Sequence, residues 1–226
     1  NQVNHGHLDL GAFEIDALGV RWARALGSAN YNLPGHWAGK RGGQRWSYYR
    51  LNSASHNICM MGGQDQDPLA TSTLTSVKLN QTDPSAVVDL TQAYADFAQS
   101  ASRGVKMIAD RTAVLVQDEF TVEKSWYLVW GMTTDADIQV EGGSLARLKL
   151  QGKELVVRLL SPAGAEFTVG SAEQEPPQKT NKGVKRLLVG LAEAQGDVRI
   201  AVLFSPVRAA GQPQAERIEI KPLTQW

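Results

Sequence analysis

The recurrence of short apolar runs is the feature that most limits how this chain of 226 residues can fold. From residue 74 onward, runs rich in Val, Leu, Ile and aromatic residues alternate with Gly, Pro, Asn and Asp, a pattern typical of strands joined by turns. The pattern predicts an all-β protein built as a large antiparallel β-sandwich of two packed sheets, with residues 1–226 as a single domain. The expected strands are 74–79, 86–90, 105–108, 113–116, 125–130, 138–140, 145–150, 155–160, 167–169, 184–191, 198–204 and 217–221.

The first quarter of the chain is less regular. Residues 12–25 fit either an amphipathic helix or a hairpin that turns at Leu18-Gly19. Residues 27–45 are rich in Gly, Asn and Pro, which predicts a long loop, and long loops in compact domains are often functional. Segments 46–51 and 56–61 are expected to be short strands, whereas 92–101 has a helical composition and is left unassigned.

Composition excludes several classes of function. Lysine plus arginine equals aspartate plus glutamate at 23 each, so no overall positive field would attract nucleic acid. Cys59 is the only cysteine, which rules out an intramolecular disulfide. The apolar runs are too short to span a bilayer as helices. The chain begins at Asn1 with neither an initiating Met nor a signal peptide, so we expect it to be a fragment of a longer protein.

Histidines are concentrated in the motif His5-Gly6-His7-Leu8-Asp9, and all four histidines of the chain lie in its first quarter. If this motif were an extended strand, His5, His7 and Asp9 would share one face while Leu8 packed on the other. Two imidazoles and a carboxylate could transfer a proton near neutral pH or bind a metal ion. Two solvated histidines at an exposed strand end would give the same pattern.

A second cluster of polar residues combines positive charge with aromatic rings. Lys40, Arg41, Arg45 and Arg50 lie within a segment that contains no acidic residue, interleaved with or close to Trp37, Trp46, Tyr48 and Tyr49. Planar rings stack on sugar faces and arginine pairs with carboxylate or sulfate, so the segment could bind an anionic sugar. A solvated basic loop is the alternative. His36 lies within this loop region, and we expect it to contact solvent.

Several ordered motifs together resemble one known family. The sequence is similar to the C-terminal β-domain of heparinase II/III-like polysaccharide lyases, most specifically over residues 4–60 and more loosely beyond. The segments that carry the resemblance are Asn4-His5-Gly6-His7-Leu8-Asp9-Leu10-Gly11, Gly19-Val20-Arg21-Trp22-Ala23, Tyr31-Asn32-Leu33-Pro34-Gly35, Arg45-Trp46-Ser47-Tyr48-Tyr49-Arg50 and Ser55-His56-Asn57.

The resemblance implies a reaction and a set of partners. Enzymes of this family cleave uronic-acid-containing polysaccharides by β-elimination, so an acidic polysaccharide is the expected substrate and His5 the expected catalytic residue. The resemblance also favours the hairpin for residues 12–25. It implies an N-terminal helical toroid elsewhere in the same polypeptide. A periplasmic or secreted location is expected on the same ground. On this interpretation the substrate-binding residues are Asn4, Tyr31, Trp37, Arg45, Trp46, Tyr48 and Arg50.

The resemblance also implies a structural zinc ion. His7 and His56 match two of the family's ligand positions, but Ala25 stands where the family has an aspartate. A methyl group cannot bind a metal, and two imidazoles alone hold zinc weakly. Asp9 could replace the missing ligand, or it could instead accept a hydrogen bond from His7.

Two other classes of function compete with a lyase domain. A non-catalytic carbohydrate-binding or scaffold module would need only the aromatic and basic loop 31–50, and the loss of an aspartate at Ala25 is in keeping with it. A metal-dependent hydrolase would need a site of three protein ligands, which the sequence alone does not assemble.

Overall fold

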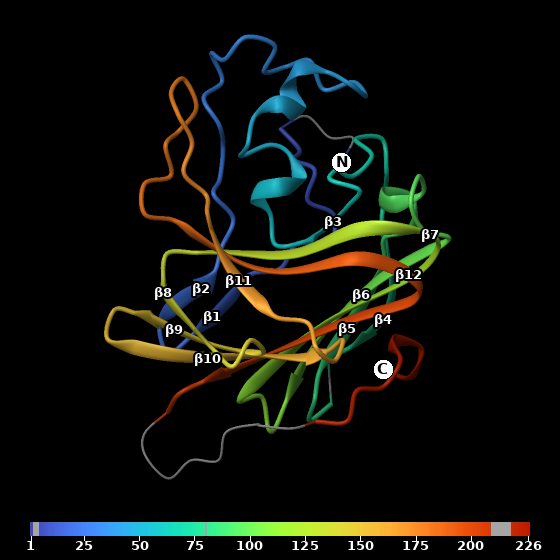
Figure 1. The fold of residues 1–226 in the computed structure, drawn as a ribbon, viewed down its shortest axis with the longest axis vertical. Coiled ribbons are helices and arrows are strands. Elements are labelled where there is room, and N and C mark those ends of the chain that lie inside the picture. Colours follow the sequence, from blue (N-terminus) through green and yellow to red (C-terminus); the bar gives the residue numbers. More distant parts are fainter. Residues whose placement is uncertain (2–4, 80, 209–217) are drawn as a thin grey trace.

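The computed structural model describes residues 1, 5–79, 81–208 and 218–226, and these form almost entirely strands, turns and short 3-10 helices (Figure 1). The all-β class is therefore confirmed. Among the described residues, no helix is long and apolar enough to cross a membrane. The elements are β1 Ile15–Ala17, β2 Val20–Ala23, η1 Gln44–Ser47, η2 Ser53–Ser55, β3 Cys59–Met61, β4 Thr73–Lys78, β5 Ser85–Asp89, η3 Thr91–Tyr94, β6 Ser100–Ile108, β7 Ala113–Thr134, β8 Asp137–Glu141, β9 Leu145–Leu150, β10 Lys153–Ser161, β11 Phe167–Ser171, β12 Lys185–Pro206 and η4 Leu223–Gln225.

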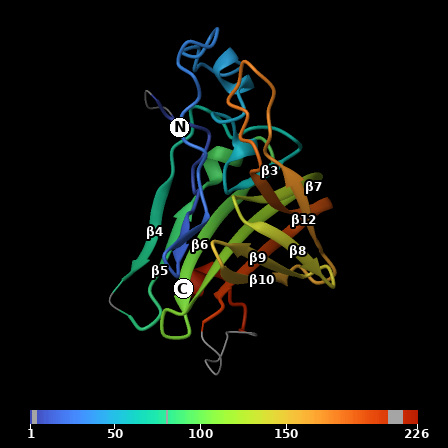
Figure 2. The ribbon, with the colours of Figure 1, turned by 90° about the vertical axis from the view of Figure 1, so that its left-hand side faces the viewer.

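Two long strands, β7 and β12, connect the layers of the sandwich. The order of the main sheet is β4-β5-β6-β7-β12-β10-β9-β8, with β3 paired to β7 and β11 to β12, and all pairs are antiparallel. The sequence pattern predicted two strands within each of β7 and β12, whereas each forms one continuous strand. Figure 2 shows β4 and β8 at opposite edges of this sheet.

The main sheet folds over so that its two halves share one core. Trp130 pairs with Val189 and Phe204 pairs with Val114, so the two rings belong to opposite halves of the β7–β12 ladder. Their centroids are nevertheless 6.5 Å apart, and both rings are fully buried. The ladder shifts register between Leu191 and Gly196, an irregularity of the kind that lets a sheet bend. The predicted sandwich thus forms mainly from one continuous hydrogen-bonded sheet rather than from two separate large sheets.

The segment before β3 carries the largest differences from the sequence-based expectation. The hairpin is confirmed: β1 pairs with β2, and Leu18 and Gly19 adopt φ values of 56° and 73°, as a two-residue hairpin turn requires. The predicted strand over 46–51 is wrong, because η1 and turns occupy that region, and in 56–61 only Cys59–Met61 is a strand. Residues 5–12 form turns and irregular coil rather than a strand.

The remaining expected elements are mostly correct, with shifted ends. Residues 92–101, which the sequence left unassigned, contain the end of η3 and the start of β6. In the expected strand 217–221, residue 217 lies outside the described residues and 218–221 is not a strand. Figure 1 shows the irregular segments before β3 and the loop between β11 and β12 at the same end of the molecule.

A fully buried ion pair links this irregular end to the sheet. Arg103 on β6 donates to both carboxylate oxygens of Asp118 on β7, at 2.7 and 2.8 Å, and both side chains are 1% exposed. Burial lowers the pKa of the guanidinium, but the Asp118 carboxylate outweighs it and the net shift is upward. Arg103 Nη1 also donates to the carbonyls of Gly11 and Asn57, at 2.9 and 2.5 Å. The pair therefore fixes two coil segments as well as two strands.

Asp118→Asn should destabilise the chain strongly, because it leaves the Arg103 guanidinium buried without a counter-charge. We expect the free energy of unfolding in urea to fall by about 3–5 kcal/mol. Asp16→Asn is the control, since Asp16 also forms a two-bond pair, with Arg21, but at the exposed surface. That control should leave the urea midpoint nearly unchanged. Equal effects of the two variants would contradict the importance of the buried pair.

Candidate functional site

His5 lies on an exposed turn, among aromatic side chains. Its φ is 66°, in the left-handed region that non-glycine residues rarely adopt, so it departs from the extended backbone expected from the sequence. Its ring centroid is 5.6 Å from that of Tyr31 and 5.1 Å from that of Trp37. His5 consequently belongs to a different group of side chains from His7 and Asp9, although all three were expected on one face.

The group around His5 contains four rings, which we name the aromatic cluster: His5, Tyr31, His36 and Trp37. His36 lies 5.0 Å from Tyr31 and 4.8 Å from Trp37 between ring centroids. Tyr31 and Trp37 are 49% and 55% exposed, whereas His36 is only 1% exposed. The expectation that His36 contacts solvent is therefore wrong. The cluster presents two large aromatic rings and one imidazole, that of His5, at the surface.

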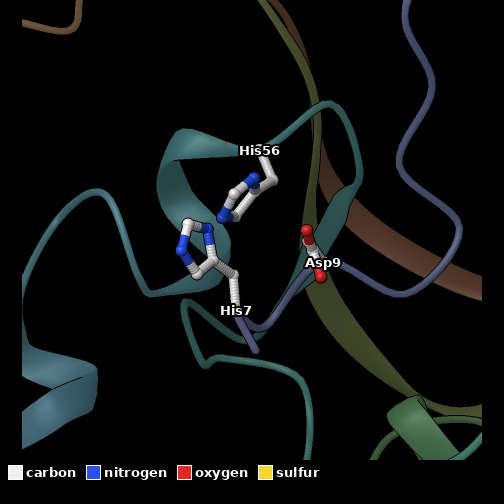
Figure 3. Close-up of side chains that lie close together, drawn as sticks. All are labelled: His7, Asp9 and His56. Carbon is white, nitrogen blue, oxygen red and sulfur yellow. The ribbon is translucent and has the colours of Figure 1, made fainter. Parts of the chain in front are cut away.

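A second group, the His7 cluster, consists of His7, Asp9 and His56 (Figure 3). Each of these residues offers a nitrogen or oxygen atom that lies within 4.8 Å of those of the other two. The His7 and His56 rings are 5.1 Å apart between centroids. The sequence pattern placed His7 and Asp9 on one face, and the family resemblance implied His56 as a second ligand beside His7. The structure brings all three side chains together, with His56 in the coil that precedes β3.

Burial keeps both imidazoles of the His7 cluster neutral. Desolvation, with the nearby charges of His7 and Arg186, lowers the pKa of His56 to about 3, although the Arg50 backbone opposes this shift. Desolvation also lowers the pKa of His7, and Asp9 acts against it. Neither ring nitrogen of His56 makes a hydrogen bond of standard geometry to any described residue. Neutral imidazoles with free lone pairs are what a metal ion requires.

The His7 cluster fits a small divalent metal such as zinc. Four-coordinate zinc takes nitrogen and oxygen ligands at roughly 2.0–2.2 Å, so neighbouring ligand atoms lie about 3.4 Å apart. The three side chains are close enough to reach that spacing through small rotations, and the unpaired His56 nitrogens are available. Ala25, where the resemblance implied an aspartate ligand, carries only a methyl group. Asp9 is therefore the carboxylate that could complete a set of three ligands.

Backbone contacts fix the position of His56. Its carbonyl accepts a hydrogen bond from Arg186 Nη1 on β12 at 3.1 Å, and the same nitrogen donates to Thr133 Oγ1 at 2.8 Å. The neighbouring Asn57 accepts from the Thr133 N–H at 2.7 Å and donates to the Phe13 carbonyl at 2.7 Å. The coil around His56 is thus attached to the end of β7 and to the start of the β1–β2 hairpin.

The other residues predicted to bind substrate differ widely in exposure. Tyr31 and Trp37 are exposed, Arg50 is half-buried, and Arg45, Trp46 and Tyr48 are buried. Asn4 lies outside the described residues. The structure therefore brings two of the predicted side chains, Tyr31 and Trp37, next to His5 at the surface. For the other residues, contact with a substrate stays a prediction.

Arg45 and Arg50, the two arginines predicted to bind substrate, donate hydrogen bonds to backbone carbonyls of the site. Arg45 is 5% exposed and donates to the carbonyls of His36 and Gly6, at 2.7 and 2.8 Å, while its guanidinium lies over the Trp46 ring. Arg50 donates to the Leu26 carbonyl at 2.6 Å and to Asn181 Oδ1 at 2.8 Å. Arg45 thus joins the two segments that carry His5 and His36.

A pocket of about 320 Å³ lies beside the site and was not anticipated from the sequence. Leu8 and Trp46 line it together with carboxylate and carboxamide side chains from two turns. Arg41 pairs with Asp67 and approaches Asp96 at 3.9 Å. Residues 62–68 are polar apart from glycine and proline, and nothing in their spacing indicates a pocket. The lining residues are Leu8, Arg41, Gly42, Trp46, Gln64, Asp65, Gln66, Asp67, Pro68, Gln92, Ala93, Ala95, Asp96 and Phe97.

The fold and the site together define a class of protein: a β-sandwich domain that carries imidazoles and exposed aromatic rings at one end. The family model described as "Heparinase II/III-like, C-terminal" matches residues 1–197, and the chain belongs to that family. No curated protein sequence matches the chain.

Solved structures agree on the fold at low sequence identity. The chain is similar to a heparinase III described as the BT4657 gene product, with a TM-score of 0.70, 15% identity and 89% of this chain covered. It is also similar to a second heparinase III structure, with a TM-score of 0.69, 14% identity and 89% covered. It is similar as well to a heparan sulfate lyase, HepC from Pedobacter heparinus, with a TM-score of 0.69, 14% identity and 92% of this chain covered. The chain spans 30%, 30% and 32% of those three proteins.

The lowered pKa of His56 predicts that stability depends on pH. The unfolded imidazole titrates near 6.5 and the folded one at about 3, so only the unfolded state gains a proton between these values. The stabilisation is complete above pH 6.5 and declines as the pH falls toward 3. At pH 5 we expect a loss of about 2 kcal/mol relative to pH 7.5.

Urea unfolding with EDTA present measures this loss without bound metal. His56→Gln should reduce the pH dependence by about this amount, because glutamine does not titrate, and the smaller contributions of His7 and His36 should remain. His5→Gln is the control, since His5 is exposed, and should retain the wild-type dependence. A wild-type chain equally stable at pH 5 and pH 7.5 would show that His56 is not held neutral by burial.

Proposed function

We propose that this chain is the β-domain of a polysaccharide lyase that cleaves a uronic-acid-containing polysaccharide by β-elimination. Family membership supports the class of enzyme. The observation that carries the assignment of the site is the position of His5, exposed and flanked by the rings of Tyr31 and Trp37. The domain contributes one wall of the substrate cleft. A helical toroid domain of the same polypeptide contributes the other wall, and the whole protein acts in the periplasm or outside the cell.

In this proposal His5 touches the reacting atoms. β-Elimination removes the C5 proton of the uronate, and the electron pair left behind forms the C4–C5 double bond as the C4–O bond breaks. A neutral imidazole within hydrogen-bond distance of the C5 proton can accept it. Tyr31 and Trp37 supply faces on which neighbouring sugar rings can stack. The group that neutralises the carboxylate and the acid that protonates the leaving oxygen belong to the toroid.

Zinc bound by His7, Asp9 and His56 has a structural role in this proposal. As a bound cation, zinc would hold the segment 5–9 against the coil at His56. The neutral His56 ring, neither nitrogen of which makes a hydrogen bond of standard geometry to a described residue, supports this arrangement. His5, two residues from His7, would then be positioned through the backbone they share.

A non-catalytic carbohydrate-binding module is the second candidate. The exposed Tyr31 and Trp37 rings favour it, because stacking on sugars requires no imidazole. The two functions differ in their need for His5, so substitution of that residue in the full-length parent separates them.

His5→Ala and His7→Ala should damage the parent enzyme in different ways. His5→Ala should lower kcat by a factor of about 10²–10⁴, the usual contribution of a positioned acid or base, and should leave Tm nearly unchanged. His7→Ala should lower Tm, and activity should fall mainly through that loss of order. The measurements are the rate of unsaturated uronate formation, followed by its ultraviolet absorbance, and thermal unfolding. A near-normal kcat for His5→Ala would favour the binding module.

Asp9→Asn should weaken zinc binding at least tenfold if Asp9 is the third ligand, since an amide oxygen is a much poorer zinc ligand than a carboxylate. Competition with a chromophoric chelator measures the affinity in the isolated chain. Asp16→Asn, on the exposed hairpin, is the matched control. Ala25→Asp tests the alternative position. Unchanged affinity in Asp9→Asn, with a gain in Ala25→Asp, would place the third ligand at residue 25.

A further inference from the structure

His36 is buried without hydrogen bonds from its ring. It is 1% exposed, and among the described residues neither Nδ1 nor Nε2 has a hydrogen-bond partner. Most buried polar atoms in native proteins are paired, and an unpaired one lowers stability by about 1–3 kcal/mol. A phenylalanine ring would fill similar space without this penalty. Among the described residues, then, both ring nitrogens of His36 are left to bond to another molecule.

The loop fixes the backbone of His36. Its N–H donates to the Leu33 carbonyl at 3.0 Å, and its own carbonyl accepts from buried Arg45 at 2.7 Å. Gly35, with a φ of 66°, has Gln44 packed where a Cβ would lie. These contacts fix the backbone at His36, and the rings of Tyr31 and Trp37 pack against its imidazole.

The rings that cover His36 are the ones that face solvent beside His5. Tyr31 and Trp37 contact both imidazoles, and about half of each aromatic side chain is exposed. His36 thus lies directly behind the aromatic surface. A ligand at this surface would therefore reach the ring nitrogens of His36 only if the Trp37 or Tyr31 ring moved aside.

We propose that His36 is a specificity-determining residue, which hydrogen-bonds a hydroxyl group of the sugar unit stacked on Trp37 or Tyr31. This inference rests on the proposed carbohydrate function and adds a polar contact to it. A neutral imidazole offers one donor and one acceptor, and a sugar hydroxyl offers both in return. Burial, together with the charges of Arg45 and His5, lowers the pKa of His36, which keeps the ring in that neutral form.

The test compares His36→Phe with the wild-type 226-residue chain by calorimetric titration. The probes are a sulfated heparan-type tetrasaccharide and an unsulfated alginate-type tetrasaccharide. Phenylalanine keeps the ring packing but has no polar atoms, so affinity for the tetrasaccharide that binds should fall roughly three- to tenfold. Tm should stay level or rise, because no polar ring atom is left unpaired. Tyr127→Phe alters an exposed aromatic residue on β7 and is the control.

Nitrogen NMR of the histidine rings gives a readout that a packing role would not change. On saturation with the tetrasaccharide, a ring nitrogen of His36, assigned by its loss in His36→Phe, should shift. Equal affinities for the wild type and His36→Phe would overturn the inference, and so would a wild-type chain that binds neither tetrasaccharide. The lyase proposal would survive both results, because it depends on turnover by the His5→Ala parent.

Discussion

The buried pair between Arg103 and Asp118 is the interaction on which the candidate site depends most. The sheet satisfies its own backbone through strand pairing, but the coil that carries the histidines has little pairing of that kind. Arg103 lies at the boundary between the two, bonded to Asp118 within the sheet and to the Gly11 and Asn57 carbonyls in the coil. Without its counter-charge the guanidinium would be a buried, unpaired cation, and its bonds to both coil segments would be weakened.

Buried arginines that bond to backbone carbonyls recur around the site, and their charges affect the nearby histidines. Arg45 and Arg186 also bond to backbone carbonyls from buried positions, and arginine suits this role because its guanidinium carries five donors in a fixed plane. Their charges add to the desolvation that lowers the pKa of His7, His36 and His56. The residues that hold the coil in place therefore also keep its imidazoles neutral, the form that can bind a metal ion or accept a proton.

Much of the fold could be predicted from the sequence because strands leave a local pattern. Apolar runs and turn residues located β4, β5 and β8 to β11 to within a few residues, and Leu18-Gly19 located the hairpin turn. The continuity of β7 could not be predicted in this way, because residues 117–124, between its two apolar runs, mix polar with apolar side chains, yet residues 117–122 still pair with β12. The burial of Arg45 and Trp46 could not be predicted either. A basic and aromatic segment has the same sequence pattern whether it faces solvent or bonds to buried carbonyls.

The histidine motif shows where local reasoning holds and where it ends. Leu8 is fully buried, its N–H donates to the Leu51 carbonyl at 3.0 Å, and its carbonyl accepts from Ser53 Oγ at 3.0 Å. Around this anchor His7 and Asp9 keep the alternation of an extended chain and meet at His56, although no strand forms. The alternation stops at His5, where the positive φ turns the ring toward Tyr31 and Trp37. One reversal of the backbone thus divides a five-residue motif between two sites, which allows the His7 cluster to bind a metal while His5 stays free to meet a substrate.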